Sequence, residues 1–359
     1  MKRRRIKKTA LLIIFLVISG LSCIATSFIY LYLASPIDKN NQKEIDVTIK
    51  EGTSTREIAS ILENKGLIRS GTFFLIYSKL NKCDSLKASN YTFKKSMSLN
   101  TIFETICEGD YGKDIITITF KEGKRITDYA KVISNNTNHD EEDVIEVVND
   151  KEYLNTLINK YWFLTEDILN PAIYYPLEGY LYPDTYKFEN KNVKIEKIIE
   201  TMLDETENKI ADLKDEITNG VHTPHEYFTL ASIAELEGTN TENRKMIVGI
   251  FENRLKINMS LGSDVTTYYA LQKPMTSDLT AEEFNMVNPY NTRSANVKGL
   301  PVGPICSFSK NTLTAAIEPT ESDYLYFVAD ATGNIYYTKT SAEHTKKVAE
   351  LKDQGKWIW

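Results

Sequence analysis

Cysteine and histidine are scarce in this chain of 359 residues, with four of each. Three cysteines, Cys83, Cys107 and Cys306, lie outside an apolar N-terminal segment. They allow at most one disulfide, so the fold does not depend on a disulfide framework, and the sequence leaves open whether any two of them pair. The histidines form no His-Glu-x-x-His motif and no zinc-type cysteine pair accompanies them. We therefore expect neither a metal site nor a cofactor.

Basic residues are in the minority once the N-terminus is set aside. Six of the 43 Lys and Arg lie between Lys2 and Lys8. The rest of the chain therefore has 37 basic residues against 49 Asp and Glu, and its net charge is about −12. A protein that binds nucleic acid needs clustered positive charge to neutralise phosphates. We therefore expect no nucleic-acid partner.

The segment 10–34 contains no charged side chain and is mostly apolar. As a helix it would extend about 37 Å, enough to cross a bilayer. Because the basic cluster precedes it, the positive-inside rule predicts a cytoplasmic tail (1–9), a single transmembrane helix (10–34), a linker (35–43) and an ectodomain outside the cell membrane. A cleaved signal peptide is the alternative, but the run is long for one and lacks an Ala-x-Ala boundary.

A strand-turn-helix pattern occurs twice in the first half of the chain. An alternating strand and a Glu-Gly turn at 46–52 precede an amphipathic helix at 55–62, and the same order recurs at 117–123 and 126–133. An internal repeat of this kind predicts two small modules of similar structure.

The residues between the two copies predict a strand at 88–93 and a helix at 98–107 that ends at Gly109. The layout resembles LysM-like modules, which bind amino-sugar glycans, and assigns a LysM-like region to 44–140. A strand-turn-helix scaffold without glycan binding is the alternative, because such repeats are widespread.

The segment 176–188 is dense in aromatic residues, glycine and proline around two acids. Tyrosine rings stack on sugars and carboxylates bind hydroxyls, so we expect a substrate-binding loop whose candidate contacts are Glu178, Tyr180, Tyr182 and Asp184. A well-packed aromatic loop is the alternative. Helical segments are predicted on both sides of this loop, at 141–169 and 193–218.

The stretch from Thr223 to Gly238 predicts a helix with both ends marked. Thr223 and Glu226 form a capping box, proline fits the first helical position, and Gly238 is a natural stop. At about 100° per residue, Glu237 falls within the apolar arc, whereas Glu235 falls on the polar side with Thr229 and Ser232.

A carboxyl at the end of an apolar stripe loses hydration and meets the negative end of the helix dipole. Both effects favour the neutral acid, so Glu237 is a candidate general acid. A solvated glutamate in a frayed last turn is the alternative.

Downstream, the sequence predicts a helix at 241–256 and backbone-rich loops at 288–305 that shape a cleft with the central helix and the 176–188 loop. A helix at 310–317, strands at 324–329 and 335–339 joined by a turn, and a last helix follow. The sequence assigns no role to the C-terminal tryptophans, Trp357 and Trp359.

The order of seven motifs resembles the endolytic murein transglycosylases, the YceG-like family. These motifs are Glu-Gly-Tyr-Leu-Tyr-Pro-Asp-Thr-Tyr (178–186), Ala-Ser-Ile-Ala-Glu-Leu-Glu (231–237), Asn-Arg-Leu (253–255), Ser-Asp-Val-Thr (263–266), Tyr-Asn-Thr (290–292), Gly-Leu-Pro-Val-Gly-Pro-Ile (299–305) and Tyr-Leu-Tyr-Phe-Val (324–328). Seven motifs in the right order are more specific than any one of them.

The resemblance implies a membrane-anchored enzyme that cuts nascent peptidoglycan strands internally, beside the peptidoglycan synthases, and so limits strand length. Glu237 matches the family's catalytic glutamate. The motifs add candidate substrate contacts from the second half of the chain: Asp264, Thr266, Asn291, Thr292, Gly299 and Pro301. The sequence departs from the family at Leu236, Gly238 and Ser307-Phe308, which affects the expected local shape of the cleft.

Two rival interpretations use other features of the chain. Ser307-x-x-Lys310 has the Ser-x-x-Lys pattern of penicillin-binding proteins, but the accompanying Ser-x-Asn at 294–296 precedes it and the third element lacks its glycine. A membrane-tethered glycan-binding or scaffold protein without catalysis is the stronger rival.

The sequence thus predicts an α+β fold. It comprises an N-terminal transmembrane helix, a LysM-like region and a mixed helical catalytic domain (141–359) that ends in a small hairpin. With one catalytic carboxyl, the resemblance implies a lytic reaction that leaves 1,6-anhydro-N-acetylmuramic acid ends, because glycoside hydrolysis needs two carboxylates.

Overall fold

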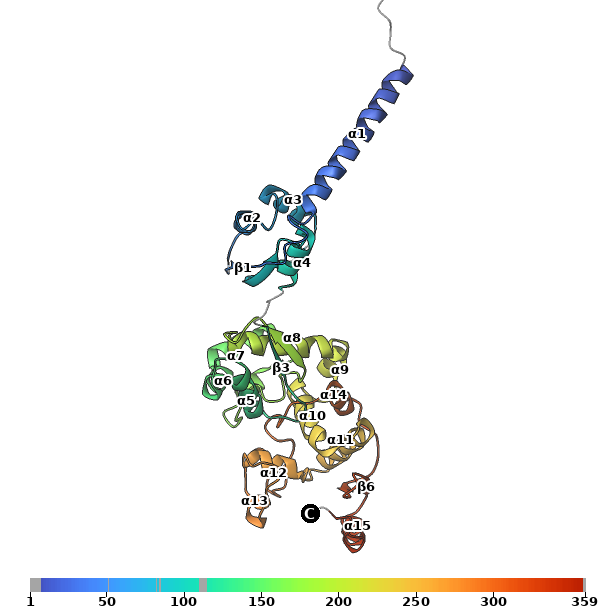
Figure 1. The fold of residues 1–359 in the computed structure, drawn as a ribbon. Coiled ribbons are helices and arrows are strands. Elements are labelled where there is room, and N and C mark those ends of the chain that lie inside the picture. The colour runs from blue at the N-terminus through green and yellow to red at the C-terminus, as the bar shows by residue number, and fades with distance from the viewer. Residues whose placement is uncertain (1–7, 51, 82, 84, 110–114, 358–359) are drawn as a thin grey trace, which may run out of the picture. The chain divides into compact units, whose positions relative to one another are not determined.

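The computed structural model describes residues 8–50, 52–81, 83, 85–109 and 115–357. In these residues helices predominate and the strands form three two-stranded sheets, so the predicted α+β class is confirmed (Figure 1). The chain divides into two compact units, Met1–Ile116 and Thr117–Trp359.

Unit 1 contains a two-stranded antiparallel sheet packed against short helices. Its elements are α1 (Lys8–Ala34), β1 (Glu44–Ile49), α2 (Thr55–Asn64), α3 (Gly71–Leu80), β2 (Ser89–Lys94) and α4 (Leu99–Glu108). Val47 on β1 lies opposite Tyr91 on β2, and both side chains are buried in the core with Phe74 and Phe93. The sequence predicts β1, α2, β2 and α4 but misses α3.

Helix α1 covers the segment for which a transmembrane helix is predicted. Of the predicted cytoplasmic tail (1–9), residues 1–7 lie outside the described part. Within the described residues, no helix satisfies both the length and the apolarity required of a membrane span.

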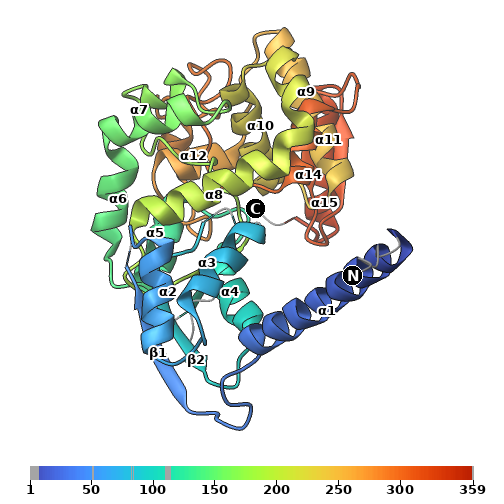
Figure 2. The ribbon, with the colours of Figure 1, turned by 90° about the horizontal axis from the view of Figure 1, so that it is seen from above.

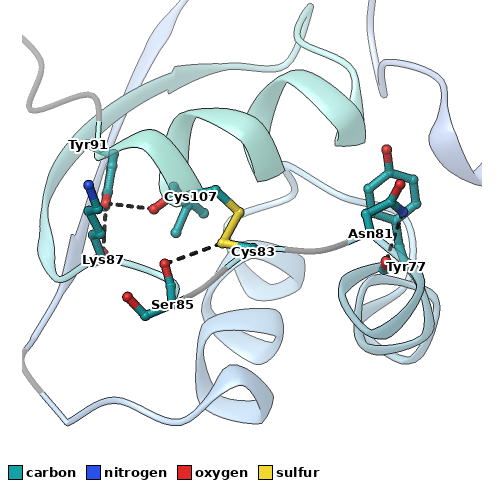
Figure 3. The surroundings of a disulfide bond; sticks show 8 residues. Tyr77, Asn81, Cys83, Ser85, Lys87, Tyr91 and Cys107 are labelled. Carbon is teal, nitrogen blue, oxygen red and sulfur yellow. Dashed lines mark hydrogen bonds between the residues drawn. A yellow bond between two sulfur atoms is a disulfide. The ribbon is translucent and has the colours of Figure 1, made fainter. Parts of the chain in front are cut away.

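A disulfide joins Cys83 to Cys107, which settles the pairing that the sequence leaves open. It links the segment after α3 to the end of α4 (Figure 3). Nearby, the Tyr91 hydroxyl donates to the carbonyl oxygen of Lys87 at 2.7 Å. Cys306, in unit 2, is a buried free thiol.

Unit 2 begins at the second residue of β3 (Ile116–Thr119) and holds the remaining elements. These are α5 (Ile126–Asn136), α6 (Glu141–Asn149), α7 (Lys151–Lys160), η2 (Glu166–Leu169), β4 (Thr185–Phe188), α8 (Ile195–Ile210), η3 (Ala211–Leu213), α9 (Lys214–Asn219), α10 (Pro224–Glu237), α11 (Thr241–Lys256), α12 (Asp264–Ala270), α13 (Ala281–Asn285), α14 (Lys310–Ile317), β5 (Tyr326–Ala329), β6 (Ile335–Thr338) and α15 (Ser341–Asp353). Within this unit α6 and α7 lie at one edge, and α9, α11 and α15 at the other (Figure 1, Figure 2).

The two copies of the predicted repeat form the expected elements but belong to different units. The first is β1 and α2 in unit 1, whereas the second, β3 and α5, packs with unit 2 because β3 pairs with β4. The turn between β3 and α5 is held there as well, since Gly123 N donates to Ser307 O at 2.8 Å. The compact division therefore lies before the boundary at 140/141 that the sequence predicts.

Helix α10 is the centre of unit 2, packed against α9, α11, α12 and α14. Its side chains are buried on every face from Tyr227 to Ala234, including the polar Thr229 and Ser232. The side of the helix that carries Thr229 and Ser232 is therefore buried as well as the apolar side. The hydroxyls are satisfied internally: Thr229 donates to His225 O at 2.7 Å, and Ser232 donates to Thr229 O and accepts from Ile305 N.

The C-terminal hairpin is confirmed. Strands β5 and β6 pair antiparallel, with Tyr326 opposite Thr338, and α15 packs against both strands. Of the two C-terminal tryptophans, Trp359 lies outside the described residues.

Candidate active site

Glu237 is the last residue of α10, whose ends are those predicted. Thr223 caps the helix in a capping box with Glu226, and Gly238 follows Glu237 directly. A side chain at Gly238 would place its Cβ 2.5 Å from Arg244 Cγ and 3.0 Å from Arg244 N. The glycine therefore allows α11 to fold back closely after Glu237.

The carboxyl of Glu237 accepts a hydrogen bond from a serine hydroxyl: Ser263 Oγ donates to Glu237 Oε1 at 2.5 Å. Burial raises the pKa of Glu237 from an ordinary 4.5 to about 7, although the Ser263 hydrogen bond opposes the shift. Near neutral pH a large share of this carboxyl is protonated, as a general acid requires.

Charged groups around Glu237 act on its pKa in opposite directions. The carboxylate of Asp264 raises it, and the guanidinium groups of Arg293 and Arg254 lower it. Asp264 and Arg293 form an ion pair with 3.1 Å between Oδ1 and Nε. Burial raises the pKa of Asp264 as well, against the effect of Arg293. Two carboxyls and two guanidiniums thus share one small region.

Arg254 joins the loop before Ser263 to the C-terminal hairpin. Its Nε donates to Leu325 O at 2.6 Å, its Nη1 donates to Leu261 O, and its guanidinium lies 5.2 Å from the centre of the Tyr326 ring. Gly262 has φ +63°, and a Cβ there would come within 2.8 Å of Arg254 Nη1. Only glycine satisfies both the backbone conformation and the space.

Thr266 and Thr292, two predicted substrate contacts, lie next to Ser263 but have no exposed surface. Their hydroxyls are 2.8 Å apart, and Ser263 N donates to Thr292 Oγ1 at 3.2 Å. In this structure they support the loop that carries Ser263, and their placement corrects the predicted direct contact with substrate.

Asn291 also has a supporting place. Its Nδ2 donates to three carbonyl oxygens at the end of α13, those of Glu283, Phe284 and Met286, and its Oδ1 accepts from Thr267. The residue is fully buried. Its amide ties α12 and α13 together and leaves no group for a ligand, which corrects the predicted contact.

Glu178 and Tyr180 lie in the core. The Glu178 carboxyl accepts from Ile126 N at 3.0 Å, at the start of α5, and from the Tyr269 hydroxyl at 3.1 Å. Burial raises its pKa to about 8. The Tyr180 hydroxyl bonds to His225 Nδ1 at 2.7 Å. Of the two interpretations of the 176–188 segment, these contacts of Glu178 and Tyr180 fit the well-packed loop and not the substrate-binding loop.

Tyr182 and Asp184 are partly exposed and lie beside α8. Asp184 forms an ion pair with Lys209 at 3.4 Å, and Lys209 Nζ also lies 5.4 Å from the centre of the Tyr182 ring. Among the described residues, no hydrogen bond or ion pair connects either of them to Glu237.

The loop 299–305 contributes backbone conformation and not side-chain chemistry. Gly299 has φ +84° with open space where a side chain would begin, and Pro301 is buried. Val302 O accepts from His225 Nε2 at 2.9 Å, which fastens the loop to the start of α10.

Glu235 differs from Glu237 in its bonding partners, and its carboxyl is not solvated. Its side chain is 6% exposed and forms an ion pair with Arg244 at 2.6 Å. Its Oε2 accepts from Ser309 N at 3.1 Å and from the Thr312 hydroxyl, at the start of α14. Glu235 therefore holds α11 and α14 to α10.

The sequence did not single out Ser263, Arg254 or Arg293. Ser263 and Arg254 lie inside two of the seven motifs, and Arg293 directly follows a third. Their positions in or beside the motifs are the signal that could have identified them. In the described part of the chain, no group of three or more His, Cys, Asp or Glu could hold a metal ion.

Comparisons with known proteins place these residues in context. The family model described as YceG-like family matches residues 47–350. A Bacillus subtilis (strain 168) protein named endolytic murein transglycosylase is 33% identical over 315 residues, covering 88% of this chain and 86% of that protein. A Streptococcus pneumoniae (serotype 2) protein of the same name is 33% identical over 95% of this chain and 65% of its own length. A crystal structure of a YceG-like protein from Listeria monocytogenes has a TM-score of 0.61 and 37% identity, and covers 85% of this chain and 99% of that one.

Proposed function

Since the chain belongs to the YceG-like family, we propose that it is an endolytic peptidoglycan transglycosylase with Glu237 as its catalytic acid and base. The observation that carries the proposal is the protonation of Glu237. Its carboxyl lies at the end of a buried helix, and its pKa is raised to about 7. The relatives' name supplies the substrate class, the glycan strands of peptidoglycan.

The reaction needs only one carboxyl from the protein. Neutral Glu237 gives its proton to the glycosidic oxygen as the bond to C1 of N-acetylmuramic acid breaks, with an oxocarbenium-like transition state. The resulting carboxylate takes the proton of that sugar's 6-hydroxyl as O6 closes onto C1, which is intramolecular and therefore favoured by proximity. The product is a 1,6-anhydro end, and Glu237 regains its proton.

The charges near Glu237 suit this cycle. Desolvation and Asp264 favour the neutral acid before the bond breaks, whereas Arg293 and Arg254 stabilise the carboxylate that follows. A pKa of about 7 lies close to the value at which one group serves well in both directions.

The location of the enzyme is part of the proposal. The uncharged segment 10–34, preceded by six basic residues, supports a single-pass anchor with a cytoplasmic N-terminus and the chain after the anchor outside the cell membrane. There the enzyme would meet strands as peptidoglycan synthases release them and would limit their length. Unit 1, with its LysM-like layout, would bind the glycan.

The test uses full-length protein in detergent and long, purified glycan strands. We expect wild-type protein to shorten the strands internally and to produce anhydro ends, and Glu237→Gln to be folded and inactive. Loss of a positioned general acid costs about 10² to 10⁴ in rate. Glycan binding without cleavage by folded wild-type protein would favour the scaffold function instead.

A further inference from the structure

The two carboxyl oxygens of Glu237 differ in their surroundings. Oε1 accepts the Ser263 hydroxyl at 2.5 Å. Among the residues that the structure describes, no donor bonds to Oε2. An oxygen that already accepts a hydrogen bond is the poorer site for a proton, so the arrangement places the acid proton on Oε2.

The position of Ser263 is fixed by two threonine hydroxyls, which bind its backbone from both sides. Ser263 N donates to Thr292 Oγ1 at 3.2 Å, and Thr266 Oγ1 donates to Ser263 O at 2.6 Å. Thr292 N also donates to Thr266 Oγ1 at 3.1 Å. We call Thr266 and Thr292 the threonine clamp.

The direction of every hydrogen bond in the clamp follows from proton counting. The single proton of the Thr266 hydroxyl lies on its bond to Ser263 O. In the 2.8 Å contact between the two threonine hydroxyls, Thr292 is therefore the donor. Neither threonine has a proton left for Glu237, and the hydroxyl proton of Ser263 is the one directed at Oε1.

We propose that Ser263 is a positioning residue that fixes which oxygen of Glu237 carries the acid proton, and that the threonine clamp holds Ser263 in that place. The inference rests on the proposed function and deepens it. In the first half of the reaction Oε2 gives its proton to the leaving oxygen as the C1–oxygen bond breaks. In the second half Oε2 takes the 6-hydroxyl proton as O6 bonds to C1, and no co-reactant is needed. The bond from Ser263 to Oε1 persists throughout, so the carboxyl does not have to rotate.

Substitution of Ser263 has two effects that a general loss of structure would not produce. Because the Ser263 hydrogen bond stabilises the carboxylate, Ser263→Ala should raise the pKa of Glu237 further. The alkaline limb of the kcat/KM profile should move up by about half to one pH unit. The rate constant kcat should fall by about 10- to 100-fold, as for loss of a hydrogen bond to a charged group, with KM changed less than about threefold.

Variants of the threonine clamp test whether Thr292 holds Ser263 in place. Thr292→Val keeps the shape but removes the hydroxyl, so it should move the pH limb in the same direction as Ser263→Ala, by less. Thr292→Ser keeps the hydroxyl and should restore the wild-type profile. Thr267→Val is the matched control, because it removes a neighbouring buried hydroxyl that bonds to Asn291 and not to Ser263; its pH limb should stay in place.

A second readout does not depend on activity. The pKa of the Glu237 carboxyl is measured by ¹³C NMR on full-length protein with labelled glutamate, the signal being assigned by its loss in Glu237→Gln. A higher pKa of Glu237 in Ser263→Ala supports the assignment of this hydrogen bond, whether or not the protein cleaves glycan. Wild-type protein that makes no anhydro ends would contradict only the proposed function. An unchanged pKa and pH limb in Ser263→Ala would overturn the inference. So would a Thr292→Val enzyme that loses activity and thermal stability while its pH limb stays in place.

Discussion

The raised pKa of Glu237 predicts how the stability of unit 2 depends on pH. An ordinary glutamate pKa of 4.5 and a folded-state pKa of about 7 correspond to about 3 kcal/mol at roughly 1.4 kcal/mol per pH unit. The raised pKa means that the folded state holds the proton more tightly than the unfolded state. Wild-type protein therefore loses this stability as pH rises from about 4.5 to about 7. Glutamine at 237 cannot ionise, so Glu237→Gln should gain about 3 kcal/mol relative to wild type between pH 4 and pH 8.

The assay is chemical denaturation followed by tryptophan fluorescence. All three tryptophans, at 162, 357 and 359, lie in the second part of the chain, so their signal reports on unit 2 and not on unit 1. The contribution of Glu178, whose pKa is also raised, is common to both proteins and cancels in the difference. A difference between variant and wild type that stays within about 1 kcal/mol across this pH range would refute the reasoning.

Glu235→Gln is the matched control on the same helix. This substitution weakens an ion pair with Arg244 at 2.6 Å and the hydrogen bonds to the start of α14. We expect it to be less stable than wild type at pH 8, the opposite sign to Glu237→Gln. A gain in stability at pH 8 for both variants would point to removal of negative charge in general.

Three further predictions concern residues that support the fold. Glu178→Gln should change stability little at pH 7, because the carboxyl with its pKa of about 8 is mostly neutral there, whereas Glu178→Ala should cost about 1–3 kcal/mol by leaving buried donors unpaired; denaturation curves compare the two. Arg254→Lys should lower stability by about 1–3 kcal/mol, because one ammonium group does not reproduce the paired bonds of the guanidinium to two carbonyls; tryptophan-detected unfolding measures it. Replacing Cys83 and Cys107 together by serine should lower the stability of unit 1 by about 3 kcal/mol, as expected for opening a 24-residue loop, and leave the tryptophan transition of unit 2 unchanged.

Local signals in the sequence were enough to place the central helix and its acid. The capping box at Thr223 and the stop at Gly238 involve neighbours in the chain, so both ends of α10 follow from the sequence. Because Glu237 lies at the end of an apolar arc, the sequence predicts that its carboxyl loses hydration and that its pKa rises. Burial does raise the pKa of Glu237 in the structure. The helix at 310–317 and the C-terminal hairpin depend on similar local patterns.

Features that depend on contacts with residues far away in the chain could not be predicted from the sequence. Glu235 lies on the polar side of α10, but Arg244 and the start of α14 cover that side, so it is buried in an ion pair. The second copy of the repeat belongs to a different unit from the first because β3 pairs with β4. The aromatic pattern of the 176–188 segment does not predict β4 as a strand. The same limit applies to Thr266, a predicted ligand contact whose hydroxyl faces inward to Ser263.

The mass of newly formed glycan ends tests the central claim most directly. Full-length protein is incubated with long glycan strands in ¹⁸O-labelled water, and the new ends are analysed by mass spectrometry. A single-carboxyl lytic reaction through Glu237 predicts 1,6-anhydro ends that are one water lighter than hydrolysis products, contain no ¹⁸O and are absent with Glu237→Gln. Reducing ends that carry ¹⁸O would contradict it, because hydrolysis requires a second carboxylate, for which the neighbouring Asp264 would be the first candidate.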